Sequence, residues 1–119
     1  MMGTRLCLDG KVFRSVANTA NGEVDGQTVF RYSQRGDIVS AVYSGGAIVQ
    51  GQLLATMDAD GQLDMRYHHL NRDGHFKIGA CRSIPVVLRD GRIRYDEMWQ
   101  WLCDDRSTGR SVIEEVPQP

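Results

Sequence analysis

The sequence is poor in the features that would place it in several large protein classes. Its 119 residues include three prolines, three cysteines and no apolar run long enough to form a transmembrane helix. Lysine and arginine (14) nearly balance aspartate and glutamate (15), so the formal net charge is -1. This balance removes the electrostatic case for a nucleic-acid-binding protein, which neutralises phosphates with excess positive charge. We therefore predict neither a nucleic-acid partner nor a membrane partner.

The cysteines point to a reducing environment. Cys7, Cys81 and Cys103 are an odd number, and their spacing is not that of metal ligands. Unpaired thiols of this kind are typical of proteins from a reducing compartment. The first eleven residues contain no apolar stretch of signal-peptide length. We predict a cytoplasmic protein that uses neither a metal ion nor a cofactor.

Helical periodicity is also missing, and turn signals divide the chain into short β-type segments. These segments are rich in Val, Ile, Tyr, Phe, Trp and Thr, which favour strands. The turn signals are Asn21-Gly22 through Asp25-Gly26, Arg35-Gly36, Gly45-Gly46, Asp60-Gly61, Asp73-Gly74, Asp90-Gly91 and the loop from Asp104 to Gly109. The predicted strands are Val12–Asn18, Thr28–Gln34, Ile38–Ser44, Ala47–Asp58, Gln62–Asn71, Phe76–Val87, Arg92–Cys103 and Ser111–Val116.

This pattern predicts an all-β fold, a single up-and-down antiparallel meander of eight strands. Such a sheet keeps two exposed edges unless it closes, and an eight-stranded barrel encloses room for side chains or one small ligand. We therefore favour a closed barrel, while two packed sheets remain open as an alternative. The predicted domain spans residues 11–116, between an N-terminal leader (1–10) and a C-terminal tail (117–119).

Two-residue hairpin loops, assumed throughout, would determine which residues share a face. Asp90-Gly91 then places Trp99 opposite Arg82, and Asp73-Gly74 places Ala80 opposite Tyr67. The two loops agree on one inward face, whose members are Leu63, Met65, Tyr67, His69, Ile78, Ala80, Arg82, Ile84, Tyr95, Glu97, Trp99 and Trp101. On this face we expect Glu97 and Arg82 to form an ion pair, because an unpaired inward carboxylate has a large desolvation cost.

The assumption of two-residue loops also predicts the inward residues of the earlier strands, but there the sequence pattern supports it less well. It places these further residues inside: Phe30, Tyr32, Val39, Ala41, Tyr43, Ile48, Gln50, Gln52 and Leu54. It leaves Val49, Leu53 and Met57 as an outer apolar row, which suggests a homodimer face. A single bulge in this strand would reverse the assignment.

The predicted interior combines aromatic walls with a few polar groups, which is typical of small-molecule pockets. The expected ligand-binding residues are Tyr43, Gln52, Tyr67, His69, Arg82, Glu97, Trp99 and Trp101. We favour a barrel that binds a small molecule. One alternative is an enzyme that uses Glu97 or His69 as a general acid or base in the same cavity. Another is a filled barrel that serves as a structural or protein-interaction module.

Several segments also carry a resemblance to a known group of proteins. They are Phe13–Val24, Gly36–Gly46, Leu63–Asn71, Cys81–Pro85, Ile93–Trp101 and Gly109–Glu115. Together they resemble small uncharacterised bacterial proteins, some of which are labelled N-acetylglutamate synthase. The resemblance implies a bacterial source and a calycin-like barrel, similar in architecture to lipocalins or avidins, and it implies no functional residue. The sequence lacks the Gly-rich pyrophosphate loop of acetyl-CoA transferases, so acetyltransferase activity is not predicted.

Overall fold

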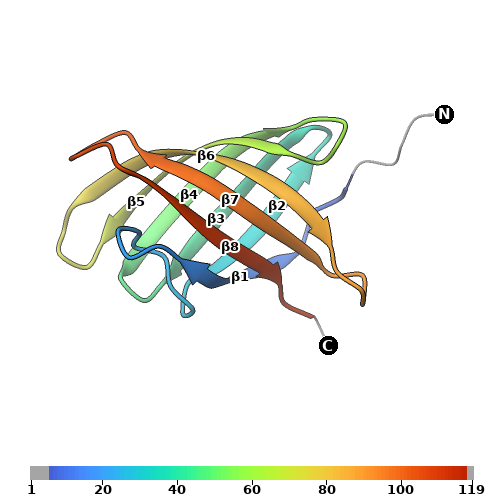
Figure 1. Ribbon diagram of the computed structural model, residues 1–119, viewed down its shortest axis with the longest axis horizontal. Helices are drawn as coiled ribbons and strands as arrows, with labels where there is room; N and C mark the ends of the chain where they lie inside the picture. The colour runs from blue at the N-terminus through green and yellow to red at the C-terminus, as the bar shows by residue number, and fades with distance from the viewer. Residues whose placement is uncertain (1–5, 118–119) are drawn as a thin grey trace.

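The computed structural model describes residues 6–117, and its eight strands form one closed antiparallel barrel. The strands are β1 (Val12–Asn18), β2 (Val29–Arg35), β3 (Ile38–Gly45), β4 (Ile48–Met57), β5 (Leu63–Asn71), β6 (Phe76–Val87), β7 (Ile93–Trp101) and β8 (Thr108–Glu115). Each strand pairs with its neighbours in sequence, and β8 closes the barrel by pairing with β1 (Figure 1). The predicted all-β, up-and-down barrel is confirmed.

The connections between strands alternate between two ends of the barrel (Figure 1). The β2–β3, β4–β5 and β6–β7 turns share one end with the segment before β1, in which Leu8 is fully buried (0% exposed). We refer to this as the packed end. The β3–β4, β5–β6 and β7–β8 connections share the other end with the long β1–β2 segment, residues 19–28. We refer to that as the cavity end. Within residues 6–117, no helix is long and apolar enough to cross a membrane.

The packed end is a tight aromatic and aliphatic core. The ring of Phe13 meets that of Tyr32 edge-on at 5.0 Å and lies 6.0 Å from that of Tyr95. Phe13, Tyr95, Leu63 and Ile113 are all fully buried. Burial of each such side chain stabilises the fold by about 1.5–3 kcal/mol. This core therefore supplies much of the stability on which the opposite end depends.

Three hairpin loops are one residue longer than predicted. The N–H of Asp58 donates to the C=O of Gln62, which leaves three residues in the loop between them. The same bond joins Asn71 to His75 and Leu88 to Arg92. Each loop ends in a glycine with positive φ: Gly61 (80°), Gly74 (83°) and Gly91 (91°). A two-residue type I′ turn would require positive φ at the aspartate before each glycine as well. None of these aspartates is among the described residues with positive φ.

The extra residue reverses β6 relative to the prediction. Cys81 rather than Arg82 lies opposite Trp99, and Gly79 rather than Ala80 lies opposite Tyr67. The residues that were predicted inward and instead lie on the outer face are Ile78, Ala80, Arg82 and Ile84. The predicted faces of β5 and β7 are nevertheless correct. The β5–β6 and β6–β7 loops each contain one extra residue, and the two register errors cancel between β5 and β7.

The same error reverses most of β4. Leu53 and Met57 are buried in the lumen, whereas Leu54 is 61% exposed on the outer face, where Gln52 also lies. A bulge between Ile48 and Gln50 keeps Ile48 inward, as predicted, and leaves Gln50 exposed. Val49 lies outside as predicted, but Leu53 and Met57 do not, so the predicted outer row does not exist and the basis for a homodimer face there is lost.

Candidate functional site

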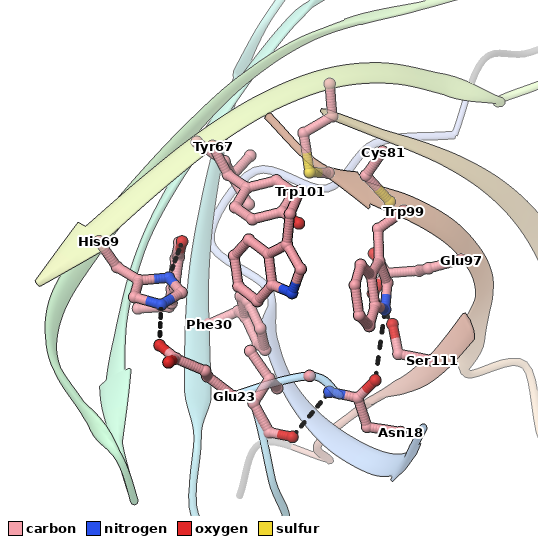
Figure 2. A pocket seen from close by; sticks show the side chains of 15 residues that line it. Asn18, Glu23, Phe30, Tyr67, His69, Cys81, Glu97, Trp99, Trp101 and Ser111 are labelled. Carbon is pink, nitrogen blue, oxygen red and sulfur yellow. Dashed lines mark hydrogen bonds and ion pairs between the residues drawn. The ribbon is translucent and has the colours of Figure 1, made fainter. Parts of the chain in front are cut away.

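A cavity of about 50 Å³ lies in the lumen toward the cavity end (Figure 2). Its apolar wall is formed by Val24, Phe30, Tyr43, Leu53, Met65, Tyr67, Trp99 and Trp101. Its polar lining is formed by Asn18, Glu23, His69, Cys81, Glu97 and Ser111. A space of this size holds roughly four water molecules. Side chains therefore fill most of the lumen, and a small, mainly apolar cavity with a few polar groups remains among them.

The aromatic wall packs over glycines of the neighbouring strands. The rings of Trp99 and Trp101 are 5.4 Å apart, and Tyr67 meets Trp101 edge-on at 6.0 Å. The cross-strand pairs are Tyr43 with Gly51, Tyr67 with Gly79, and Trp99 with Gly109. A Cβ at Gly79 would lie 2.2 Å from Cζ of Tyr67. The glycines thus allow large rings to lie flat against the barrel wall, and the small cavity remains between these rings and the other lumen side chains.

Glu97 on β7 supplies an acidic group in the lumen. Its carboxylate accepts hydrogen bonds from Ser83 Oγ at 3.1 Å and Ser111 Oγ at 2.9 Å. Burial raises the pKa of Glu97 to about 7, although both serine bonds oppose the shift. The carboxyl can therefore accept or donate a hydrogen bond near neutral pH. The predicted ion pair with Arg82 is wrong, because Arg82 lies outside and donates to Gln62 Oε1 at 3.0 Å.

His69 on β5 lies between the lumen and the mouth and is only 1% exposed. Its Nδ1 is 3.0 Å from the Tyr43 hydroxyl, and its Nε2 is 2.8 Å from Glu23 Oε1. Burial lowers the pKa of His69 despite the opposing effect of Glu23, so the ring is neutral at pH 7. In the neutral Nε2–H tautomer, the ring donates to Glu23 and its Nδ1 accepts from the Tyr43 hydroxyl, which also lies 3.3 Å from the C=O of His68.

The β1–β2 segment lies across the mouth of the cavity and is held by side chains from the lumen (Figure 2). Trp101 Nε1 donates to the C=O of Asn21 at 3.1 Å, and Trp99 Nε1 donates to Asn18 Oδ1 at 3.3 Å. Asn18 Nδ2 in turn donates to the C=O of Val24 at 2.9 Å. The two indoles therefore form part of the cavity wall and also hold the segment that covers it.

Six of the eight sequence-predicted site residues line the cavity: Tyr43, Tyr67, His69, Glu97, Trp99 and Trp101. The predicted inward orientation of Gln52 and Arg82 is wrong, because the three-residue loops reverse the faces of β4 and β6. Gln52 instead lies outside, with its Nε2 3.1 Å from Nε2 of His68. Among the described residues, no group of three or more His, Cys, Asp or Glu side chains could hold a metal ion.

Sequence reasoning missed several polar residues of the site. Cys81 lies between Ala80 and Arg82, which are wrongly predicted inward, and it faces the lumen opposite Trp99. Burial raises the pKa of its thiol, which makes it a poor nucleophile. Asn18 and Glu23 lie in or next to a loop, where no periodicity indicates direction. The turn signals at Asn21-Gly22 and Asp25-Gly26 mark this loop without showing that it folds over the lumen.

Comparison with known proteins places this geometry in context. Residues 6–116 match a family model described as "Avidin-like protein". No curated protein matches the chain. The crystal structure of apo shwanavidin (P1 form) is similar, with a TM-score of 0.61 over 97% of this chain and 100% of that chain. The two share 8% sequence identity, so this similarity concerns the fold.

Proposed function

Because the chain belongs to the avidin-like protein family, we propose that it binds a small molecule in the barrel lumen. The observation that carries this proposal is the cavity, in which aromatic rings surround the polar groups of Glu97 and His69. Apolar walls with a few placed polar groups are typical of small-molecule sites. The proposed ligand-binding residues are Tyr43, Tyr67, His69, Glu97, Trp99 and Trp101.

Two properties of the ligand follow from these walls. A planar ring would stack or meet edge-on with Trp99, Trp101 and Tyr67, since aromatic pairs favour such arrangements. A polar group next to Glu97 would pair with its carboxyl in either protonation state. The cavity of about 50 Å³ is smaller than most ligand pockets. Binding therefore requires the β1–β2 segment to move, and the ligand enters at the cavity end.

The test is a binding screen on the intact protein. Native mass spectrometry against a library of small metabolites and vitamins, biotin among them, identifies ligands, and tryptophan fluorescence measures their affinities. Leu53→Phe adds volume to the cavity wall, whereas Leu54→Phe adds the same volume on the outer face. We expect the first variant to weaken binding at least tenfold and the second to leave it unchanged. Equal affinities in both variants would contradict binding in the lumen.

A second candidate function, acid–base catalysis, is favoured by one observation. The pKa of Glu97 is raised to about 7, which suits a group that exchanges protons near neutral pH. His69 is less suited, because both ring nitrogens are engaged by Tyr43 and Glu23. Turnover of a bound ligand by the native protein, together with its loss in Glu97→Gln, would establish catalysis. Binding without turnover would leave the protein a binding module.

We also propose that the protein is bacterial and cytoplasmic. Cys7, Cys81 and Cys103 are all unpaired, which supports a cytoplasmic location. The bacterial source depends on the six resembling segments of the sequence. Fractionation of the native host tests the location, because a protein recovered outside the cytoplasm would contradict it.

A further inference from the structure

We propose that His69, Asn71 and Lys77 form a carboxylate-binding site at the cavity end, that Glu23 fills this site in the ligand-free protein, and that a ligand carboxylate displaces Glu23. This inference rests on the proposed function, since it names the chemical class of the lumen ligand. It also assigns the β1–β2 segment a role as a displaceable lid.

The first observation is the set of donors around the Glu23 carboxylate. Oε1 lies 2.8 Å from His69 Nε2, and Oε2 accepts a hydrogen bond from Asn71 Nδ2 at 3.1 Å. Lys77 Nζ lies 3.9 Å from Oε2 and 5.3 Å from the centre of the Trp101 ring. The carboxylate thus faces two hydrogen-bond donors and the Lys77 ammonium, whose closer partner is Asp104; this combination suits an anion.

The second observation is that the barrel orients these donors independently of Glu23. The Tyr43 hydroxyl engages Nδ1 of His69, which directs Nε2–H toward the mouth. Asn71 Oδ1 accepts the backbone N–H groups of Asp73 and His75, which directs Nδ2 the same way. Lys77 is held by an ion pair with Asp104. The site is therefore built on β5, β6 and the loops beside them and would persist after Glu23 leaves.

The third observation concerns the element that carries Glu23. His69, Asn71 and Lys77 belong to regular strands, whereas Glu23 lies in the irregular β1–β2 segment. The Glu23 side chain is 22% exposed, so it borders solvent as well as the cavity. His69 and Glu23 both line the lumen cavity. A molecule seated in the cavity against the indoles can therefore place a terminal carboxylate where that of Glu23 now lies.

These observations indicate the class of ligand, an aromatic or aliphatic body that ends in a carboxylate. A neutral analogue would leave Glu23 in place or leave the oriented donors without an anionic partner. The ligand carboxylate competes with an internal carboxylate, so removal of Glu23 should strengthen binding. A side chain that only braced the fold would have the opposite effect when removed.

The first test is chemical rescue of Glu23→Ala, which leaves the site empty. Thermal unfolding is followed in sodium formate and in sodium chloride of equal ionic strength. We expect formate at about 0.2 M to raise the Tm of this variant by on the order of 5 °C above chloride. The native protein should show no formate-specific rise, because Glu23 fills the site. Asp64→Ala is the matched control, because it removes a carboxylate from the exposed Asp64–Arg66 ion pair.

The second test keeps the proposal falsifiable if Glu23→Ala does not fold. Glu23→Gln retains the shape, but its amide NH2 would face another donor, either His69 Nε2–H or the Asn71 NH2 group, and this makes it a weaker occupant. We expect this variant to bind 3-phenylpropionate about tenfold more tightly than the native protein and 3-phenylpropionamide with less than about twofold change. Equal or weaker binding of the carboxylate would overturn the proposal.

Failure of this inference and failure of the proposed function give different results. Formate rescue of Glu23→Ala needs no lumen ligand. If formate stabilises this variant but the screen finds no ligand, the anion site is retained and lumen binding is rejected. A folded Glu23→Ala protein that binds screened ligands and shows no formate-specific stabilisation would overturn the inference alone.

Discussion

The two ends of the barrel are built from the same strands but differ in chemistry. At the packed end, Phe13 and Tyr95 are fully buried, and the Tyr95 hydroxyl donates to the C=O of Gly61 at 2.9 Å. At the cavity end, the rings of Trp99 and Trp101 leave about 50 Å³ unfilled, and the buried groups include His69 and Asn71. The packed end is filled by apolar side chains, whereas the cavity end is covered by a loop that is hydrogen-bonded to the indoles.

This difference separates stability from binding within one small domain. A core without voids resists change, because removed atoms leave a cavity that neighbours refill only in part. The cavity lacks some of those packing contacts from the outset, and its few polar groups are available to a ligand. The packed end therefore allows the cavity end to remain incompletely packed.

Phenylalanine truncation at each end gives the largest expected effect. Phe13→Ala should lower the free energy of unfolding by about 4 kcal/mol, because Phe13 is enclosed by packed neighbours. Phe30 stacks on Tyr43 but also borders the cavity, so Phe30→Ala should cost about half as much. Urea denaturation measures both. Equal losses would show that the two ends are packed alike.

The pH dependence of stability should report the carboxyl in the cavity. The pKa of Glu97 is raised from 4.5 to about 7 in the folded protein. The contribution of protonated Glu97 is therefore present below pH 4.5 and is lost as pH rises through 7. The corresponding free energy is about 3 kcal/mol. We expect the stability of the native protein relative to Glu97→Gln to fall by that amount between pH 4.5 and pH 8.

His69 provides an internal contrast in this experiment. Its pKa is lowered by burial, so its contribution is present above pH 6.5 and is lost as pH falls. Native protein and Glu97→Gln share this dependence, and the difference between their stabilities removes it. A difference that stays constant with pH would mean that the carboxyl is not desolvated.

The glycines of the barrel wall should tolerate substitution unequally. Gly79→Ala places a Cβ 2.2 Å from Cζ of Tyr67 and forces this ring toward the cavity. We expect a loss of about 2 kcal/mol, typical of overpacking. Gly26→Ala is the control, since the nearest atom to its Cβ lies at 3.8 Å. Circular dichroism during thermal unfolding compares them, and a neutral Gly79→Ala would show that the ring is loosely held.

The fold was accessible from sequence because turn signals and β-forming segments are local properties. All eight strands were predicted to within a few residues, and Val12–Asn18 and Phe76–Val87 have the predicted bounds. Which side chains of β4 and β6 point into the barrel could not be predicted in the same way. An Asp-Gly pair fits a two-residue loop or the last two positions of a three-residue loop, and the choice reverses every side chain of the next strand.

The site was predictable where it lies on strands whose register errors cancelled. Trp99, Trp101, Glu97, Tyr67 and His69 all line the cavity as expected. The position of Glu23 depends on tertiary contacts to His69 and Asn71, which lie 46 and 48 residues away along the chain. No local pattern encodes such contacts, so the position of Glu23 over the cavity became visible only in the structure.

The smallest expected effect tests the corrected register directly. Arg82 and Ser83 are adjacent on β6 but lie on opposite faces, and Ser83 is fully buried against Glu97. Arg82→Ala removes an exposed contact with Gln62 and should change the free energy of unfolding by less than about 0.5 kcal/mol. Ser83→Ala should cost about 1–2 kcal/mol, because Glu97 loses a hydrogen bond. The reverse ranking in urea denaturation would place Arg82 inside the barrel after all and restore its ion pair with Glu97.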